Sequence, residues 1–347
     1  MKLNKIFAIA LCALCFTACS DDDDNEIIRT EGEYYGAFVL NQGNMNKNIP
    51  GSLTNIDFET GKAYQNVFKE ANGRILGDTP QSVIIYGDKM YIAVYQSNII
   101  EIVDKKTLVS EKTIKLGNTA CSPRYMAAKD NYVYISMYDG YVSRLDTRTQ
   151  TIDKTVAVGP NPNEVALAGN YLYVANSDGE NAPNYGTTVS KINLSTFTEE
   201  CKIEVGLNPY KMASNGEDAF VICMGNYQEV SATIKRINSD DTVTEICPAT
   251  MAVANGDDLY IVNDPNYGTG TEYYRYKIST KEKTALKFDK IIAPQAIGIN
   301  PKDGHIFIST LSVVYGWSDP CFVNEYTANC EFVNQYESGI YSASIVF

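Results

Sequence analysis

Side chains able to perform acid–base or nucleophilic chemistry are sparse in this sequence. It contains one histidine, His305, and no Ser-His-Asp triad can be built from a residue so placed. His305 directly precedes an expected strand, the second of the four strands that repeat along this chain. The loops that could bind a ligand lie at the other end of that strand, so we expect His305 to be a solvated turn residue. Glu164 and Asp139 are possible partners for glycoside chemistry, but nothing in the sequence sets their separation. We therefore expect a protein that is not an enzyme.

The sequence also gives little indication of a metal site or a disulfide. Asp264 or Asp178 could hold Ca²⁺ in a loop, but no EF-hand spacing surrounds either. Among the six cysteines that follow Cys19 there is no CxxC pair and no Cys/His cluster, so we expect no metal and no cofactor. Cys321 and Cys330 are close in sequence but fall at opposite ends of one expected strand, too far apart for a disulfide. An exported protein could pair its cysteines, but we expect most to be small buried hydrophobes. The remaining four of this group are Cys121, Cys201, Cys223 and Cys247.

Amides and aromatic rings supply the chemistry that the sequence does offer. Amide side chains both donate and accept hydrogen bonds, and Tyr and Trp present flat apolar area at low entropic cost. Any single Asn is explained by turn formation, because Asn tolerates positive φ. A ring of such residues, nearly all neutral, suits a large neutral ligand, with an oligosaccharide or a protein partner as alternatives. The candidate ligand-binding residues are Asn41, Gln42, Asn44, Tyr95, Gln96, Arg124, Tyr125, Tyr138, Asn163, Asn176, Tyr185, Tyr210, Asn226, Tyr227, Asn263, Asn266, Tyr267, Gln295, Tyr315, Trp317 and Tyr341.

Repeating strands must position these residues. Residues 122–159 read as four short strands, at 124–128, 132–137, 141–145 and 150–158, separated by polar turns. The same pattern recurs along the chain. A period of about 40 to 45 residues with four strands is typical of a propeller blade. In a blade, the loop from strand two to strand three and the loop from strand four to the next blade lie on the same face of the ring, which is the usual ligand face. We expect Gln81, Glu164 and Lys211 to lie on that face as well.

Two sets of residues mark the repeat. The first is a proline before the first strand, with spacings of 39 to 47 residues, at Pro80, Pro123, Pro162, Pro209, Pro248 and Pro294, and Gly339 in the seventh place. The second is an aromatic residue in the second strand, at Tyr91, Tyr134, Tyr173, Phe220, Tyr260 and Phe307.

The two ends of the chain predict how the ring closes. Residues 34–41, 53–58 and 64–68 match the second, third and fourth strands of a blade that lacks its first. The tail, residues 339–347, reads as a lone first strand. We therefore predict an all-β fold, a seven-bladed β-propeller of four-stranded blades over residues 34–347, with the C-terminal strand joining the N-terminal blade. Such a join leaves no exposed edge inside the ring.

A targeting segment precedes this domain. Lys2 and Lys5 form a basic head, residues 6–16 an apolar run, and Cys19 ends a segment that looks like a bacterial lipobox. We expect a lipoprotein signal peptide at 1–18, lipidation at Cys19, and an acidic flexible tether at 19–33. The run Asp21–Asp24 resembles an acidic signal for export to the outer leaflet, which predicts a surface-exposed outer-membrane lipoprotein. Cleavage leaves 27 basic and 42 acidic residues, a net charge of −15, which argues against nucleic-acid binding.

The repeat resembles the YncE-like group of seven-bladed propellers. The resemblance rests on the anchoring prolines, on turns such as 104–107 (DKKT) and 146–149 (DTRT), and on the strand starts 158–162 (VGPNP) and 205–209 (VGLNP). Together with the acidic export tail and the abundance of Asn and Tyr, the chain is similar to cell-surface corrinoid binders of the BtuG type. That resemblance implies capture of a corrinoid such as cobalamin as a bound ligand and its transfer to a TonB-dependent outer-membrane transporter.

Overall fold

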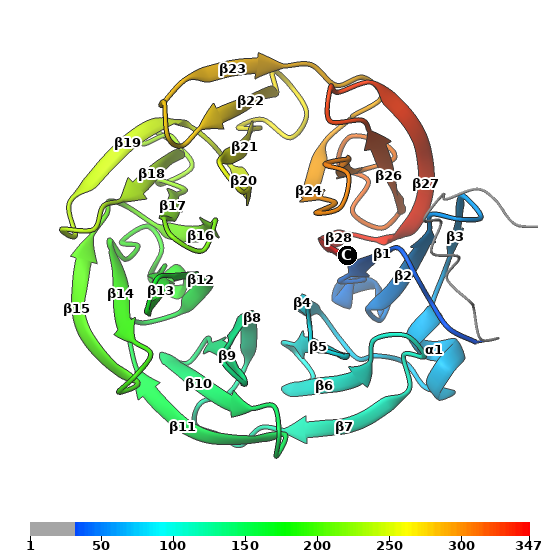
Figure 1. The fold of residues 1–347 in the computed structure, drawn as a ribbon, viewed down its shortest axis with the longest axis horizontal. Helices are drawn as coiled ribbons and strands as arrows, with labels where there is room; N and C mark the ends of the chain where they lie inside the picture. The colour runs from blue at the N-terminus through cyan, green and yellow to red at the C-terminus, as the bar shows by residue number, and fades with distance from the viewer. Residues whose placement is uncertain (1–31) are drawn as a thin grey trace, which may run out of the picture. The chain divides into compact units, whose positions relative to one another are not determined.

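Seven four-stranded antiparallel sheets form a ring in the computed structural model, which describes residues 32–347 (Figure 1). Within it, Glu33–Phe347 is one compact unit. The predicted all-β, seven-bladed propeller is therefore confirmed. The predicted signal peptide, Cys19 and nearly all of the tether lie outside the described residues. No helix within 32–347 has the length and apolar character to span a membrane.

Each blade is named here in chain order, with its strands given from the channel outward. Blade 1 consists of β28 (Ser342–Val346), β1 (Ala37–Asn41), β2 (Ser52–Asp57) and β3 (Lys62–Tyr64). Blade 2 consists of β4 (Pro80–Tyr86), β5 (Lys89–Val94), β6 (Ile99–Asp104) and β7 (Ser110–Lys115). Blade 3 consists of β8 (Pro123–Lys129), β9 (Tyr132–Met137), β10 (Tyr141–Asp146) and β11 (Thr151–Ala157). Blade 4 consists of β12 (Pro162–Ala168), β13 (Tyr171–Asn176), β14 (Thr188–Asn193) and β15 (Thr198–Glu204).

The last three blades repeat this order. Blade 5 consists of β16 (Pro209–Ser214), β17 (Ala219–Cys223), β18 (Thr233–Ile237) and β19 (Val243–Pro248). Blade 6 consists of β20 (Met251–Asn255), β21 (Asp258–Asn263), β22 (Glu272–Lys277) and β23 (Lys283–Leu286). Blade 7 consists of β24 (Pro294–Ile299), β25 (Ile306–Thr310), β26 (Pro320–Tyr326) and β27 (Phe332–Ile340). Short helical segments are α1 (Val67–Asn72), η1 (Met45–Lys47) and η2 (Gly179–Asn181).

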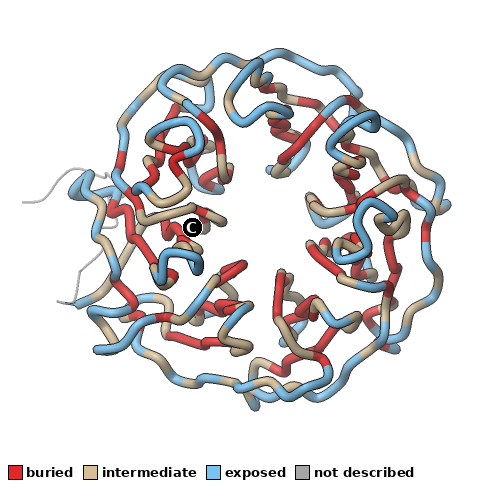
Figure 2. The backbone as a smooth tube through the Cα atoms, turned by 180° about the vertical axis from the view of Figure 1, so that it is seen from behind, coloured by how far each residue is buried: buried red, intermediate tan, exposed pale blue. Residues whose placement is uncertain are grey.

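Apolar side chains fill the spaces between neighbouring blades. The aromatic residue of each second strand reaches toward the next blade: Tyr91 of β5 shares a core cluster with Ile135 of blade 3, and Phe307 of β25 shares one with Val39 of blade 1. Burying such a side chain stabilises the fold by about 2 kcal/mol. Figure 2 shows the result, with buried residues concentrated in the inner strands and exposed residues along the outer rim. The ring thus holds its inner strands, and the loops above them, in fixed positions.

The ring closes as the sequence predicts, by pairing of β28 with β1. Phe38 lies opposite Val346 and Leu40 opposite Ser344. The predicted start of this strand at Gly339 is wrong, because Gly339 belongs to β27 and β28 begins only at Ser342. A Cβ at Gly339 would lie 2.7 Å from both Asn41 Nδ2 and Ser52 Oγ, so glycine serves close packing there.

Two further boundaries differ from the prediction. Pro248 is the last residue of β19 and does not mark a first strand, which in blade 6 starts at Met251. Residues 64–68 are not a strand: β3 ends at Tyr64 and helix α1 begins at Val67. Val67 and Phe68 are buried in the core between blades 1 and 2, and Gly73, with φ 66°, ends the helix.

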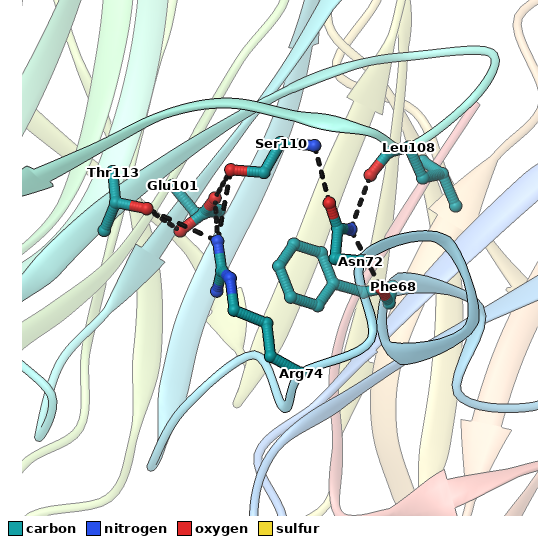
Figure 3. A network of polar contacts seen from close by, with 7 residues as sticks. All are labelled: Phe68, Asn72, Arg74, Glu101, Leu108, Ser110 and Thr113. Atoms are coloured by element: carbon teal, nitrogen blue, oxygen red, sulfur yellow. Dashed lines mark hydrogen bonds and ion pairs between the residues drawn. The ribbon is translucent and has the colours of Figure 1, made fainter.

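Helix α1 is held against blade 2 by a polar network (Figure 3). Arg74 Nη2 donates to Glu101 Oε1 at 2.7 Å, and Thr113 Oγ1 donates to Glu101 Oε2 at 2.8 Å; the Ser110 hydroxyl also donates to this carboxylate. Asn72 Nδ2 donates to the Leu108 carbonyl at 2.8 Å, and Asn72 Oδ1 accepts from Ser110 N–H at 2.7 Å. The Glu101 side chain is fully buried, so these donors replace its lost hydration.

Candidate functional site

The innermost strands of six blades carry a β-bulge directly after their first residue. In β8, for example, Pro123 pairs with Met137 and Met126 with Ile135, so two residues stand opposite Ser136. Only β20 among these inner strands pairs without such a shift. A bulge re-aims side chains and commonly does so near functional sites. The extra residues are Gln81, Arg124 and Tyr125, Asn163 and Glu164, Tyr210, Gln295 and Ala343.

Arg124 is the central residue of a polar network formed by these bulges. Its guanidinium lies 4.9 Å from the ring centre of Tyr95 and 4.8 Å from that of Tyr138, within the range of a cation–π contact with each. Nε and Nη2 donate to Asn163 Oδ1 at 3.0 and 2.9 Å, and Nη2 also donates to the Tyr210 hydroxyl at 3.3 Å. Within residues 32–347 Arg124 forms no ion pair, so its positive charge is not neutralised by direct contact.

The network continues around blades 2 to 5. Asn163, which is fully buried, donates from Nδ2 to the Tyr210 carbonyl at 3.0 Å. Gln81 Nε2 donates to the Tyr125 hydroxyl at 2.9 Å. Burial raises the pKa of Tyr125 well above its usual value, so this phenol is neutral at physiological pH. The four blades therefore present hydrogen-bonding groups whose orientation is fixed before any ligand arrives.

An aromatic cluster occupies the other side of the same face, on the loops of blades 6, 7 and 1. We define it as Tyr267, Tyr315, Trp317 and Tyr341. The Tyr267 ring lies 5.7 Å from Trp317 in an edge-to-face arrangement and 6.1 Å from Tyr315, and Trp317 lies 5.7 Å from Tyr341. Asn44 Nδ2 fixes the Trp317 loop by donating to the Trp317 carbonyl at 3.1 Å and to Ser318 Oγ at 2.9 Å.

Four tyrosines of this face have left-handed backbone conformations. They are Tyr227, Tyr267, Tyr315 and Tyr341, with φ of 60°, 49°, 61° and 56°. Bulky residues rarely adopt this region, and each costs about 1–2 kcal/mol relative to ordinary conformations. The exposed fractions of Tyr227, Tyr267 and Tyr315 are 60%, 51% and 63%, so burial offsets little of this strain. Left-handed residues also occur in turns elsewhere, at Leu108, Gln150 and Phe197 for example, so these three turns are distinguished by carrying an exposed aromatic ring in that conformation.

A central cavity of about 250 Å³ lies beneath the two groups and is lined by residues from all seven innermost strands. Glu164 and Lys211 both line it. Burial raises the pKa of the Glu164 carboxyl and lowers the pKa of the Lys211 amine. Glu164 Oε2 accepts from Met212 N–H at 2.7 Å, and within the described chain no cation lies within 4.0 Å of that carboxylate.

The polar network and the aromatic cluster meet across the cavity mouth. The pKa of Tyr341 is raised first by burial and then by the nearby hydroxyls of Tyr210 and Tyr267. Burial likewise raises the pKa of Tyr138, with a further contribution from Tyr210. The Tyr210 hydroxyl thus lies near both Tyr341 of the aromatic cluster and Tyr138 of the polar network.

Several predicted site residues turn inward and serve the fold. Asn41 Oδ1 accepts from Ser338 and Ser342, and its Nδ2 donates to Thr54 Oγ1 at 3.1 Å. Asn176 bonds Thr188 and Ser190 across its own blade. Asn263 Nδ2 donates to Glu272 Oε2 at 3.1 Å. The side chains of Asn41 and Asn176 are thus buried and hydrogen-bonded within the protein, and their contact with a ligand stays a prediction.

The remaining predicted residues lie on the loop face. Tyr185 packs edge-to-face on Tyr227 at 6.1 Å. Asn226 Oδ1 accepts from Val230 N–H at 2.8 Å, which is turn chemistry. Gln295 Nε2 donates to the Pro294 carbonyl, and Gln42 N–H donates to the Tyr341 carbonyl. Gln96 and Asn266 are exposed.

Two residues of this face were not among the predicted ones. Asn161 Nδ2 donates to the Tyr138 carbonyl at 3.2 Å, and Asn208 Nδ2 donates to the Gly225 carbonyl at 3.2 Å and to the Tyr227 hydroxyl at 3.4 Å. Each asparagine directly precedes an anchoring proline, and that Asn-Pro pair was the available signal. Both hold the loops that carry candidate tyrosines.

The residues considered for chemistry are dispersed. Asp139 Oδ1 accepts from Cys121 N–H in a loop, whereas Glu164 lines the cavity. His305 is not a solvated turn residue: its Nδ1 lies 2.7 Å from Glu325 Oε1, and Tyr336 donates to the other carboxylate oxygen. The six cysteines of the described chain are free, and no three His, Cys, Asp or Glu residues within 32–347 could hold a metal together.

Comparisons with known proteins place the fold and the family. Hydrazine synthase of Kuenenia stuttgartiensis is similar, with a TM-score of 0.61 at 12% identity over 77% of this chain and 89% of that chain. The computationally designed Ika8 protein matches with a TM-score of 0.59 at 11% identity over 89% of this chain and 86% of its own. Likeness at such low identity shows the propeller fold alone. No curated protein sequence matches the chain. Residues 35–342 match one family profile, and this protein therefore belongs to the family described as Domain of unknown function (DUF5074).

Proposed function

We propose that this propeller captures a ligand on its loop face without transforming it, and that the ligand is a corrinoid such as cobalamin. The observation that carries the proposal is the set of strained, exposed tyrosines beside Trp317. Glycine would satisfy the same turns at lower cost, so these positions carry an aromatic ring at the expense of backbone strain.

The dimensions of the site support a ligand that spans the mouth. Pockets that enclose drug-sized molecules occupy about 300–1,000 Å³, so a cavity of about 250 Å³ cannot contain a macrocycle. A broad ring lying across the mouth would instead contact the aromatic cluster with its apolar face. Its peripheral amides would meet the polar network around Arg124 and Tyr210 on the other side.

Transfer to a membrane transporter extends the proposal. The sequence features of residues 1–33 favour a lipidated protein tethered at the outer-membrane surface, and the similarity to BtuG-type proteins suggests a TonB-dependent transporter as partner. The loop between β25 and β26 adds support, since Val313, Val314 and Tyr315 are each at least half exposed. An apolar tip of this kind favours contact with another protein.

Glycan recognition is the second candidate. Edge-to-face packing of Tyr267 on Trp317 leaves aromatic surface on which a sugar ring could stack. The two candidates differ in what the polar network must do, because a corrinoid uses both sides of the mouth and a stacked sugar needs the aromatic side alone.

Equilibrium dialysis tests the proposal directly. Residues 33–347 are dialysed against cyanocobalamin, with a neutral oligosaccharide mixture as a separate arm. We expect retained cobalamin absorbance at one ligand per protein, and loss of that retention in Trp317→Ala. Retention of the oligosaccharide with no retention of cobalamin would replace the corrinoid proposal by glycan recognition.

A further inference from the structure

The innermost strands of the propeller carry a charge opposite to that of the whole chain. Their charged residues are Arg124, Lys129 and Lys211 against the single acid Glu164, whereas the complete sequence has a net charge of −13. Charge within a low-dielectric channel acts more strongly than charge on a surface, because the walls focus the field. The centre of the ring therefore attracts anions although the protein as a whole repels them.

Lys211 is the part of this positive charge that lines the cavity. Within residues 32–347 its amine makes neither a hydrogen bond nor an ion pair. Lysine amines that lose water without gaining a partner are destabilised in their charged form, and burial lowers the pKa of Lys211 accordingly. An amine in this state gains the most from a ligand that brings an acceptor.

Glu164 is the charged neighbour of that amine, and Arg124 lies in the polar network outside the cavity lining. The Glu164 carboxylate is bonded to Met212 N–H and lies farther than 4.0 Å from both cations, although it interacts electrostatically with each. Arg124 uses Nε and Nη2 for its bonds to Asn163 and Tyr210, and its Nη1 makes no hydrogen bond within the described chain. Tyr125 and Tyr210, on the bulges of β8 and β16, add two phenol hydroxyls.

We propose that the central cavity is a binding site for an oxyanion, the carboxylate or phosphate group of a small molecule, with Lys211 as its direct ligand. Arg124 adds positive charge from the polar network outside the cavity lining. A cavity of about 250 Å³ admits such a group. The site stands on the residues of the channel itself and does not depend on corrinoid capture at the mouth above it.

Glu164 gives the proposal a distinctive signature. Its carboxylate competes electrostatically with an incoming anion, so its removal should tighten binding while removal of Lys211 weakens it. Glu164→Gln and Lys211→Met preserve side-chain length, and the glutamine amide oxygen can still accept from Met212 N–H. Lys202→Met serves as the matched control, since Lys202 is an exposed lysine on the outer strand β15 and carries the same charge.

Calorimetry on residues 33–347 at constant ionic strength provides the test, with inorganic phosphate and succinate as separate probes. All seven blades lie within this unit. We expect saturable binding of one anion per protein, weakened about tenfold or more in Lys211→Met, tightened by about tenfold in Glu164→Gln and unchanged in Lys202→Met. Binding of one probe alone would identify the group as phosphate or carboxylate.

Two results would overturn the proposal. One is the absence of saturable binding for both probes; the other is binding that Lys211→Met leaves unchanged, which would place the anion elsewhere. Circular dichroism melting of each variant separates lost binding from lost folding. Cyanocobalamin dialysis with Lys211→Met keeps the two proposals apart, because a variant that still retains cobalamin but no longer binds the anion has lost the cavity site alone.

Discussion

Replacing three exposed tyrosines by glycine should give a more stable protein than replacing the same tyrosines by alanine. Tyr227, Tyr267 and Tyr315 have φ between 49° and 61°, so alanine retains the Cβ strain while glycine removes it. Strain relief is worth about 1–2 kcal/mol per site, and the greater freedom of glycine in the unfolded chain offsets about 0.5–1 of this. The triple glycine variant should therefore exceed the triple alanine variant in unfolding free energy by about 1.5–3 kcal/mol.

Thermal or urea unfolding measures this difference. At about 2.1 cal/mol/K of unfolding entropy per residue, 315 residues convert it to about 2–5 °C in Tm. The two variants lose the same rings, including the contacts of Tyr267 with Tyr315 and Trp317, so lost packing cancels in the comparison. Both should lose ligand binding equally. If the alanine variant is as stable as the glycine variant, the tyrosines are not strained, and the main support for their role in binding is removed.

Four further predictions follow from the contacts described. Arg74→Ala should cost about 2 kcal/mol of unfolding free energy by removing a charged donor from buried Glu101, whereas Lys69→Ala on helix α1 should cost little; equal losses in urea unfolding would contradict this role. Glu164→Gln should stabilise the protein at pH 8 but not at about pH 4. Burial raises the pKa of Glu164 in the folded protein, so its charged carboxylate destabilises the fold above that pKa, whereas below the unfolded-state pKa the group is protonated in both states and has no such effect. A gain in unfolding free energy that is independent of pH would argue against this. A thiol-specific reagent should detect six thiols in denatured residues 33–347, but not Cys223 in the folded protein at pH 8, since burial raises its pKa to about 11; fewer than six would reveal a disulfide. Deleting 342–347 should abolish cooperative unfolding, because β1 and the first-strand position of blade 1 are then exposed, and a normal melting curve would contradict closure by β28.

The propeller could be predicted from sequence because each blade repeats local signals. The second-strand aromatics recur wherever an inter-blade core needs a large side chain, and all six lie in second strands of the structure. The prolines mark first strands in five blades because each begins a strand just before its bulge. Blade 6 departs from the rule: β20 has no bulge, and Pro248 is free to end the preceding strand.

Helix α1 was missed because its signal is short. Six residues give less than two turns, and the apolar residues Val67 and Phe68 also suit a strand. Only packing between blades 1 and 2, with Arg74 and Asn72 bonded to blade 2, decides in favour of the helix.

The loop face could be predicted, but not which residues on it are available to a ligand. Asn41 and Asn163 are both asparagines near strand ends. Asn41 bonds Thr54 of its own blade and Ser338 of blade 7, whereas Asn163 accepts from Arg124 of blade 3. Their difference depends on neighbours from other blades, which no local pattern encodes. The positive φ of Tyr315 and the unpaired amine of Lys211 are likewise properties of the folded backbone and its packing.

Calorimetric titration of residues 33–347 with cyanocobalamin tests most directly whether this propeller captures a corrinoid at the aromatic cluster. We expect binding in the nanomolar range, weakened at least about a hundredfold by combined Tyr267→Ala and Trp317→Ala, and unaffected by Tyr64→Ala, which removes an exposed tyrosine of the outer strand β3. Absence of heat, with no colour retained after desalting, would contradict corrinoid capture and leave the fold and the family unchanged.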